Sequence, residues 1–176
     1  RERYFGRQSR GQYQPGDNRD WSLATKRRII QADANWRTAF KQCLYRPFDV
    51  RPLFYHDAVI ERSRREVMRH MLAGENLAMC IGRAGQVVGG DEWNLVTCSR
   101  KITDFNLFYR GGNVTFPLYL SPGDEAQGQL ALAPSERRPN LNPKFIADME
   151  QRLGLSFTHD GRGDLVTTFG PEDVFH

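Results

Sequence analysis

An arginine-rich aromatic segment holds the side chains of this sequence best suited to ionic chemistry. Residues 45–51 read Tyr-Arg-Pro-Phe-Asp-Val-Arg, and residues 52–55 continue with Pro-Leu-Phe-Tyr. A carboxylate between two guanidinium groups can form charge-assisted hydrogen bonds, and guanidinium groups also contact phosphates. We therefore predict that Asp49 bridges Arg46 and Arg51 in a partly buried cluster, or that these arginines grip a nucleic-acid backbone. The aromatic residues expected to pack around the cluster are Tyr45, Phe48, Phe54 and Tyr55.

Polar side chains in two loops form a second set of candidates. DNA sequence is read in the major groove chiefly by Arg or Lys on guanine and by Asn or Gln on adenine. A first loop after residues 77–81 holds these residue types together with Asp91, Glu92 and Trp93, and a second set surrounds Asp104. For each residue, an ordinary solvated loop is the alternative. The candidate base-reading residues are Arg83, Gln86, Asn94, Arg100, Lys101, Asn106, Arg110 and Asn113.

Positive charge is concentrated in the first half of the chain. Residues 1–101 carry 19 Lys+Arg against 11 Asp+Glu, a net charge of +8, whereas residues 102–176 carry 6 against 10, a net charge of −4. A GC-rich genome explains an excess of arginine over lysine, but it does not explain this asymmetry. The positive electrostatic potential of the first half attracts polyanions such as nucleic acids. The residues assigned to DNA backbone contact or to a structural cluster are Arg46, Asp49, Arg51, Arg62, Arg65 and Arg69.

No catalytic motif in the chain is convincing. The glycine-rich residues 82–90 lack the Gly-Lys-Ser/Thr ending of a phosphate loop. The dipeptides His56-Asp57 and His159-Asp160 have the composition of paired metal ligands, but supporting histidines are lacking, so capping or turn roles are favoured. An adenine methyltransferase needs an Asn/Asp-Pro-Pro-Tyr/Phe motif, which is absent. We therefore expect no catalytic residue, metal or cofactor in this chain.

The cysteines and the hydropathy of the sequence argue against a disulfide-bonded, zinc-binding or membrane-spanning protein. Cys43, Cys80 and Cys98 are too few and too scattered for a disulfide framework or a zinc site, so buried free thiols in a reducing cytoplasm are expected. No apolar run approaches the roughly 20 residues of a membrane span, and no membrane partner is expected. The chain has no initiator Met and is expected to be a piece of a larger protein.

The first half of the chain predicts two helices that flank an extended segment. A helical pattern covers residues 21–44 with a break near residues 33–35. Residues 45–55 are expected to be extended because their two prolines exclude a helix interior. Asp57 can cap a second helix over residues 58–72. The side chains expected in the core are Ile29, Ile30, Trp36, Phe40, Val59, Ile60, Val67, Met68, Met71 and Leu72.

In the second half, short strands precede a clear helix. Asn142 and Pro143 open a helix that Gly154 closes, and its inward side chains are expected to be Phe145, Ile146, Met149 and Leu153. Residues 170–176 begin a further helix. Residues 1–20 are expected to be a linker or arm, and residues 21–176 a single α+β domain of short, mainly antiparallel strands with flanking helices. The expected strands are residues 77–81, 94–98, 103–109 and 114–120, with at most one more within residues 123–140.

The order of these features resembles the C-terminal target-recognition domain of Type ISP restriction-modification enzymes and related adenine-specific DNA methyltransferases. The aromatic and basic segment of residues 45–55, the basic helix, the strands and the Phe-Pro-Leu-Tyr-Leu of residues 116–120 carry the resemblance, which is best over residues 21–120. It implies double-stranded DNA and the methyltransferase domain of the same polypeptide as partners. It also implies S-adenosylmethionine, and ATP with magnesium, in other domains of a bacterial cytoplasmic enzyme.

The resemblance also separates two roles. The motif of residues 45–51 recurs in relatives that read different sites, which implies that Arg46, Asp49 and Arg51 do not choose the DNA sequence. Two rival functions stay open. One is a metal-dependent hydrolase built on the His-Asp pairs, and the other is an interaction domain that docks a methyltransferase to a helicase.

Overall fold

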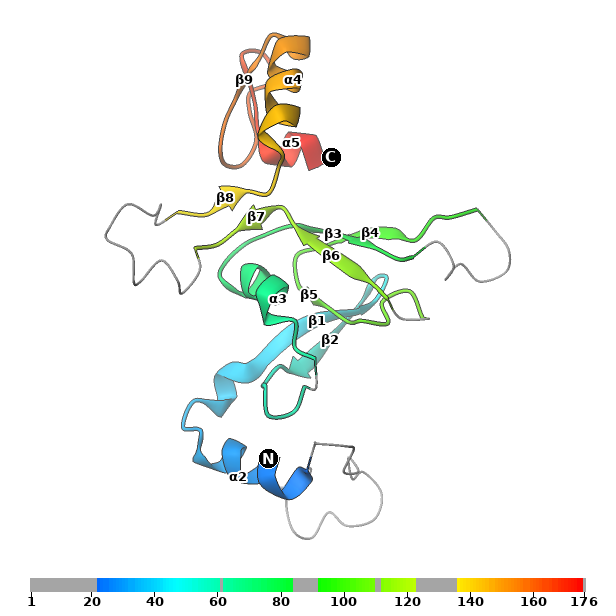
Figure 1. The fold of residues 1–176 in the computed structure, drawn as a ribbon, viewed down its shortest axis with the longest axis vertical. Helices are drawn as coiled ribbons and strands as arrows, with labels where there is room; N and C mark the ends of the chain where they lie inside the picture. Colours follow the sequence, from blue (N-terminus) through cyan, green and yellow to red (C-terminus); the bar gives the residue numbers. More distant parts are fainter. Residues whose placement is uncertain (1–21, 61, 84–91, 110–111, 123–135, 176) are drawn as a thin grey trace. The chain divides into compact units, whose positions relative to one another are not determined.

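The computed structural model describes residues 22–60, 62–83, 92–109, 112–122 and 136–175. They form short strands and helices, and the strand pairs are mainly antiparallel, so the predicted α+β class is confirmed (Figure 1). The chain divides into two compact units. The first unit contains Arg1–Gln42 and Pro52–Ser63, and the second contains Cys43–Arg51 and Arg64–His176. The arm predicted for residues 1–20 lies outside the described residues.

In the first unit, helix α2 (Leu23–Ala32) ends at the predicted break. The Asp33 carboxylate accepts a hydrogen bond from the Asn35 backbone N–H at 2.7 Å, and a short 3₁₀ helix, η1 (Trp36–Ala39), follows. The helix predicted to continue to Leu44 is wrong, because the chain becomes strand β1 at Phe40. Three aromatic rings explain the change: Phe40, Trp36 and Phe54 pack together with centroids 5.0 to 6.4 Å apart, a cross-strand contact that outweighs helix propensity.

Two core predictions for this region are also wrong. Ile30 is buried as expected, but Ile29 is 46% exposed and Phe40 is 56% exposed. Only one face of α2 is covered, and Ile29 lies next to that face rather than on it. Phe40 keeps one side of its ring in solvent while the other packs against its aromatic neighbours.

The extended segment predicted for residues 45–55 is a hairpin. Strand β1 (Phe40–Arg46) and strand β2 (Asp49–Phe54) are joined by the two-residue turn Pro47-Phe48, and β1 also pairs in parallel with β5 (Ile102–Thr103). Phe48 has a φ of 65°, in the left-handed region. Proline at the first central position and a positive φ at the second are the pattern of a type II turn, which favours glycine at the second position.

The main sheet of the second unit has the order β4-β3-β6. Its strands are β3 (Ala78–Ile81), β4 (Val96–Ser99) and β6 (Val114–Pro117), all antiparallel. One face is buried, where Cys80 packs with Leu44, Leu107 and Phe108. On the other face Met79, paired with Phe116, is 38% exposed and Phe116 is 44% exposed. The sheet therefore has one covered and one open face, as antiparallel sheets allow.

Helix α3 (Arg65–Leu72) packs on β6 and β5 and begins seven residues later than predicted. Asp57 does not cap it. Instead the His56 ring accepts a hydrogen bond from the Ala58 N–H, and the Tyr55 hydroxyl donates to the Ser63 carbonyl, which ties the end of β2 to the residues just before α3 begins. Of the expected core residues on α3, Met68 and Met71 are buried, whereas Leu72 is 36% exposed.

Two predicted strands are also interrupted. Of residues 103–109 only the first belongs to β5; turns follow, held by hydrogen bonds from Leu107 N to Asp104 O and from Tyr109 N to Asn106 O. The strand predicted over residues 114–120 divides into β6 and β7 (Tyr119–Leu120). Strand β7 pairs with β8 (Arg138–Pro139), which lies in the described part of residues 123–140, where at most one short strand is expected.

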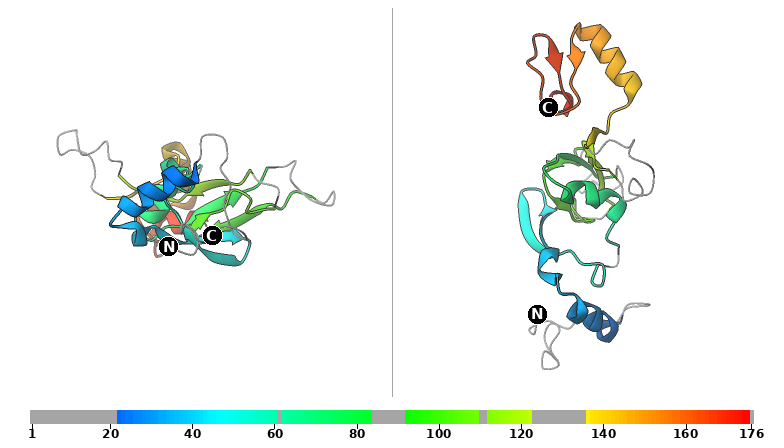
Figure 2. Two further views of the ribbon diagram at one scale, coloured as in Figure 1. Left: turned by 90° about the horizontal axis from the view of Figure 1, so that it is seen from below. Right: turned by 90° about the vertical axis from the view of Figure 1, so that its left-hand side faces the viewer.

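The C-terminal part of the second unit, from helix α4 onward, follows its local signals closely. Helix α4 (Pro143–Leu153) is capped by Asn142, which accepts from Lys144 N at 2.8 Å, and ends at Gly154 with φ 67°. It packs against β9 (Ser156–Phe157), which pairs in parallel with β10 (Thr168–Phe169), before α5 (Pro171–Phe175) (Figure 2). The prediction that Phe145 and Leu153 point inward is wrong, since they are 41% and 49% exposed.

Two of the three cysteines are buried free thiols, as predicted. Cys43 and Cys80 are buried, and burial raises their pKa to about 11 and about 12. Both therefore remain neutral thiols at physiological pH. Cys98 is exposed, because its position in β4 faces the open side of the sheet.

Candidate nucleic-acid interface

Tyr45 organises the arginines of the hairpin. The guanidinium carbon of Arg46 lies 3.9 Å from the centroid of the Tyr45 ring, and that of Arg51 lies 4.2 Å from it. A cation over an aromatic face is attracted by the ring quadrupole. One ring therefore fixes the position of both guanidinium groups next to the turn.

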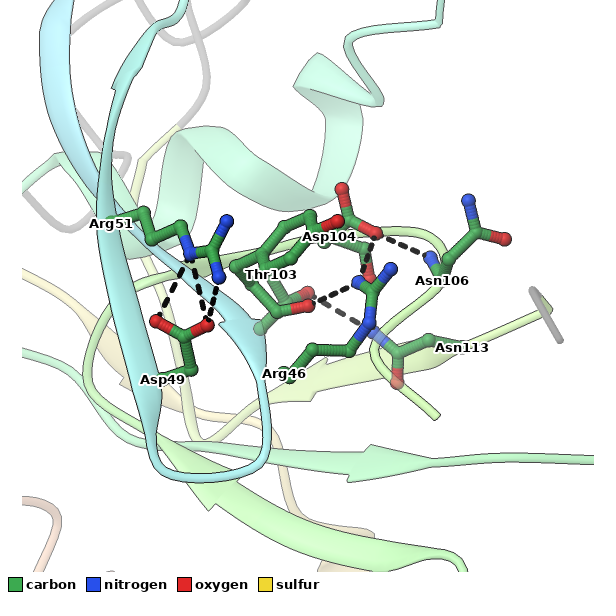
Figure 3. A network of polar contacts seen from close by, with 8 residues as sticks. Arg46, Asp49, Arg51, Thr103, Asp104, Asn106 and Asn113 are labelled. Carbon is green, nitrogen blue, oxygen red and sulfur yellow. Dashed lines mark hydrogen bonds and ion pairs between the residues drawn. The ribbon is translucent and has the colours of Figure 1, made fainter. Parts of the chain in front are cut away.

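The predicted bridge from Asp49 to both arginines is wrong. Asp49 pairs with Arg51 and not with Arg46, with Arg51 Nη2 and Asp49 Oδ2 2.7 Å apart. Arg46 Nη1 instead lies 3.2 Å from Asp104 Oδ1 and donates to the Tyr45 carbonyl oxygen. Figure 3 shows the two pairs as separate groups. The Arg51 side chain is 59% exposed and that of Arg46 is 28% exposed. Asp104 draws Arg46 away because β5 brings it beside the end of β1.

Of the aromatic residues expected around this cluster, only Tyr45 contacts it. Phe54 belongs to the aromatic group of the first unit, and Tyr55 is buried there. Phe48 is 99% exposed at the tip of the hairpin. The turn carries this side chain outward, away from the strands that flank it.

Asp104 joins residues of both predicted sets (Figure 3). Besides Arg46, its Oδ1 accepts from Asn106 N at 2.7 Å, and its backbone N–H donates to Leu44 O at 3.1 Å. Asn113 Nδ2 donates to Thr103 Oγ1 at 3.1 Å and to Thr115 Oγ1 at 3.2 Å. The amide of Asn113 thus braces the end of β6. Asn106 is bound to Asp104 through its backbone N–H, and its side chain is exposed. Sequence reasoning missed Asp104 as the partner of Arg46.

The end of β3 anchors the first predicted loop. Gly82 N donates to Leu95 O at 2.8 Å, and Trp93 Nε1 donates to Gly82 O at 3.0 Å. A Cβ atom on Gly82 would lie 2.8 Å from Leu95 Cβ and 2.9 Å from the Phe108 ring, so only glycine fits. The exposed side chains of Arg83 and Asn94 therefore start from a fixed backbone. Gln86 and Arg110 lie outside the described residues.

The exposed residues Arg100 and Lys101 lie at the other end of the same sheet. Strand register places Ile81 opposite Val96 and Val114 at one end, and Ala78 opposite Ser99 at the other. The Ser99 hydroxyl closes the turn by accepting from Lys101 N at 3.0 Å. The structure therefore separates the candidates: Arg83, Asn94 and Asn113 share one end, and Arg100 and Lys101 occupy the opposite one.

Arginines on and before α3 form a third exposed group. Arg62, Arg64, Arg65 and Arg69 are all exposed, as predicted for that surface. Arg69 Nη1 donates to Pro122 O at 3.1 Å, and Arg64 lies 3.8 Å from Glu66. The adjacent His70 is buried, and burial, together with the charges of Arg69 and Arg138, lowers its pKa.

The His-Asp dipeptides do not pair as metal ligands. His56 Nδ1 accepts from Ala58 N at 3.0 Å and its Nε2 lies 3.2 Å from Asp33 Oδ2, so both ring nitrogens are occupied and the neighbouring Asp57 is not the partner. Asp160 pairs with Arg137. In the part of the chain that the structure describes, no three His, Cys, Asp or Glu side chains gather to hold a metal ion. Within the same ranges, no helix is long and apolar enough to span a bilayer.

Comparison with known proteins places the chain among specificity domains. It belongs to the family of Type ISP C-terminal specificity domains, whose model matches residues 2–176, well beyond the 21–120 of the sequence resemblance. The fold is similar to that of a chain in a cryo-electron-microscopy structure of a DrdV–DNA complex, with a TM-score of 0.54 and 14% identity. The similarity covers 80% of this chain and 12% of that one. No curated protein matches.

Proposed function

We propose that this chain is the DNA-reading, non-catalytic part of a restriction-modification enzyme that methylates adenine at N6. Family membership over residues 2–176 carries the proposal. The similar fold in the DrdV–DNA complex supports it, because that protein is bound to DNA. In this proposal, S-adenosylmethionine is bound by a methyltransferase domain of the same polypeptide, and ATP with magnesium serves other domains.

The exposed side chains support two separate kinds of DNA contact, one to the phosphate backbone and one to the base edges. Backbone contacts come from exposed arginines, and base contacts come from side chains that reach into a groove. The arginines fixed on Tyr45 and those of α3 suit the first task. Arg83 and Asn94 are exposed and lie next to the backbone that Gly82 shares with Leu95 and Trp93, which suits the second task. Asn113 is less exposed and suits it less. Arg100 and Lys101, at the far end of the sheet, are assigned to backbone contact.

Duplex selection from a randomised library, followed by affinity measurements at two salt concentrations, tests this function. We expect an enriched sequence and an affinity that falls steeply with salt, since arginines displace counterions from phosphates. Arg83→Ala in the full-length enzyme is expected to relax preference at one base pair, at a cost of about 1–3 kcal/mol of discrimination. Arg100→Ala is the matched control and should weaken binding equally for all sequences. An affinity independent of salt, with no enriched sequence, would contradict the proposal.

A second candidate function, protein docking, is favoured for the C-terminal part of the second unit. Residues 141–176 carry three basic and six acidic residues, a net charge of −3, which opposes contact with DNA. Leu165 and Val166 lie 63% and 78% exposed in one turn of this part. An acidic surface with an apolar tip suits a protein partner, and the methyltransferase domain is the candidate that we propose.

A further inference from the structure

The turn of the β1–β2 hairpin presents an aromatic side chain in a way that folding alone does not favour. Phe48 is 99% exposed, so its ring contributes no burial to the folded state. Its φ of 65° is a region in which bulky residues are strained and glycine is not. Phe48 is thus unfavourable at this position in both respects. A strained, exposed residue of this kind motivates a functional hypothesis.

The support behind Phe48 is rigid. Strand β1 is paired with β2 on one side and with β5 on the other. Arg46, immediately before the turn, is tied to Asp104 at 3.2 Å, and Arg51 is tied to Asp49 at 2.7 Å. Both guanidinium groups also rest on Tyr45. A ring at the tip of such a hairpin keeps its direction when it is pushed against another molecule.

The groups beside the ring indicate what that molecule is. Arg51 uses Nε and Nη2 on Asp49, and more than half of its side chain remains in solvent. A planar aromatic tip flanked by guanidinium groups is suited to DNA, because the ring can stack on bases while arginines contact the neighbouring phosphates. An apolar pocket in a protein partner would accept the ring but would have no use for the arginines.

We propose that Phe48 is a wedge that inserts between neighbouring base pairs of duplex DNA and unstacks them, while Arg46 and Arg51 hold the adjacent backbone. The inference rests on the proposed function and adds a mechanism to it. An enzyme that modifies adenine must take the base out of the stack, and a wedge lowers the cost of that step. Because every base has an aromatic face, the wedge acts without regard to sequence.

A fluorescent duplex tests the wedge directly. A duplex enriched by selection on the whole chain is made with 2-aminopurine at successive positions, since the fluorescence of this base rises when it is unstacked. The unaltered chain is expected to raise the fluorescence at one step. Phe48→Gly is expected to abolish the rise and to weaken binding by about tenfold, within the range for loss of one base–aromatic stack. Phe48→Trp should retain both.

Stability measurements separate this effect from misfolding. Phe48→Gly removes an exposed ring and relieves the positive φ, so its denaturation midpoint is expected to rise. Leu165→Gly is the matched control, because Leu165 is also an exposed non-glycine residue with a φ of 58°. It should raise the midpoint as well but leave DNA affinity and fluorescence unchanged.

Each remaining outcome is decisive. If selection yields no duplex that binds, the proposed function fails and the wedge fails with it. If the unaltered chain binds its duplex but no position brightens, or if Phe48→Gly brightens it equally, the wedge is overturned while DNA recognition stands. Loss of brightening in the Leu165→Gly control as well would also overturn the proposal, because the effect would then not be specific to the hairpin.

Discussion

The β1–β2 turn and the turn that precedes β10 both place an exposed apolar residue in the left-handed region. Phe48 has a φ of 65° and Leu165 a φ of 58°. The first turn is flanked by two guanidinium groups stacked on Tyr45. The second is built around Asp164, whose carboxylate accepts hydrogen bonds from Val166 N, Thr167 N and Thr168 N. The two turns share a backbone conformation but differ in their charged neighbours, and we have proposed a different partner for each, DNA for the first and protein for the second.

One buried amide of the second unit joins elements that lie far apart in the sequence. Asn76 Nδ2 donates to His70 O and Tyr119 O, and its Oδ1 accepts from Leu77 N and Tyr119 N, at 2.8 to 3.1 Å. The Tyr119 hydroxyl in turn accepts from Gly161 N at 2.9 Å. The hydrogen-bonding capacity of Asn76 is therefore fully used, and α3, β3 and β7 meet at this side chain.

The largest predicted effect is that of Asn76→Ala. It leaves four buried backbone groups without partners and should lower the free energy of unfolding by about 3 kcal/mol. Urea denaturation followed by fluorescence measures the loss. Asn140→Ala is the matched control, because Asn140 is exposed and its amide makes one bond, to Pro117 O. Equal losses in the two variants would show that Asn76 is no more important than a surface amide.

The next effect distinguishes the two arginines of the hairpin. Arg46→Ala removes a half-buried side chain and leaves Asp104 without its ion-pair partner, so a loss of about 1–2 kcal/mol is expected. Arg51→Ala should cost less stability, because the Arg51–Asp49 pair lies mostly in solvent and is screened. Melting temperature and DNA affinity should be measured together. Equal destabilisation by the two substitutions would contradict two separate ion pairs and favour the single Arg46–Asp49–Arg51 cluster predicted from the sequence.

A smaller effect, dependent on pH, is expected at the second turn. Hydrogen bonds from Thr167, and then from Val166 and Thr168, hold the pKa of Asp164 well below its usual value. A lowered carboxyl pKa stabilises the fold above the unfolded pKa of about 4, and this stabilisation is lost as pH falls through the folded pKa. Asp164→Ala should therefore lower the melting temperature at neutral pH and flatten its decline in acid. DNA affinity should not change, and a fall in affinity would contradict the separation of the two turns.

Local signals in the sequence identify local structure but not long-range partners. Asn142, Pro143 and Gly154 fixed the limits of α4 because a cap, a first-turn proline and a closing glycine act within a few residues. The turn at Phe48 gave no such signal, since a type II turn usually carries glycine there. Asp104 lies 58 residues from Arg46 and becomes its partner only through the parallel pairing of β5 with β1.

For the candidate site, too, the sequence identified residue types but not which residues lie together. Residue types alone suggested that Arg83, Arg100 and Asn113 are equivalent candidates for base reading. The strand register places Arg100 at the opposite end of the sheet, and the contacts of Asn113 with Thr103 and Thr115 give it a structural role. Neither fact follows from composition, because both depend on which strands become neighbours.

The smallest effect on stability is expected from Val166→Ser, which changes an exposed side chain at the tip of the second turn. Its free energy of unfolding should stay within about 0.5 kcal/mol of that of the unaltered chain, as for most surface substitutions. If the acidic part of the chain docks on the methyltransferase domain, loss of the apolar tip should weaken that association while DNA affinity stays constant. Affinity for the separately prepared methyltransferase domain, with Leu153→Ser as a control exposed on α4, gives the measurement. A fall in DNA affinity with unchanged domain association would reverse the assignment of the two turns.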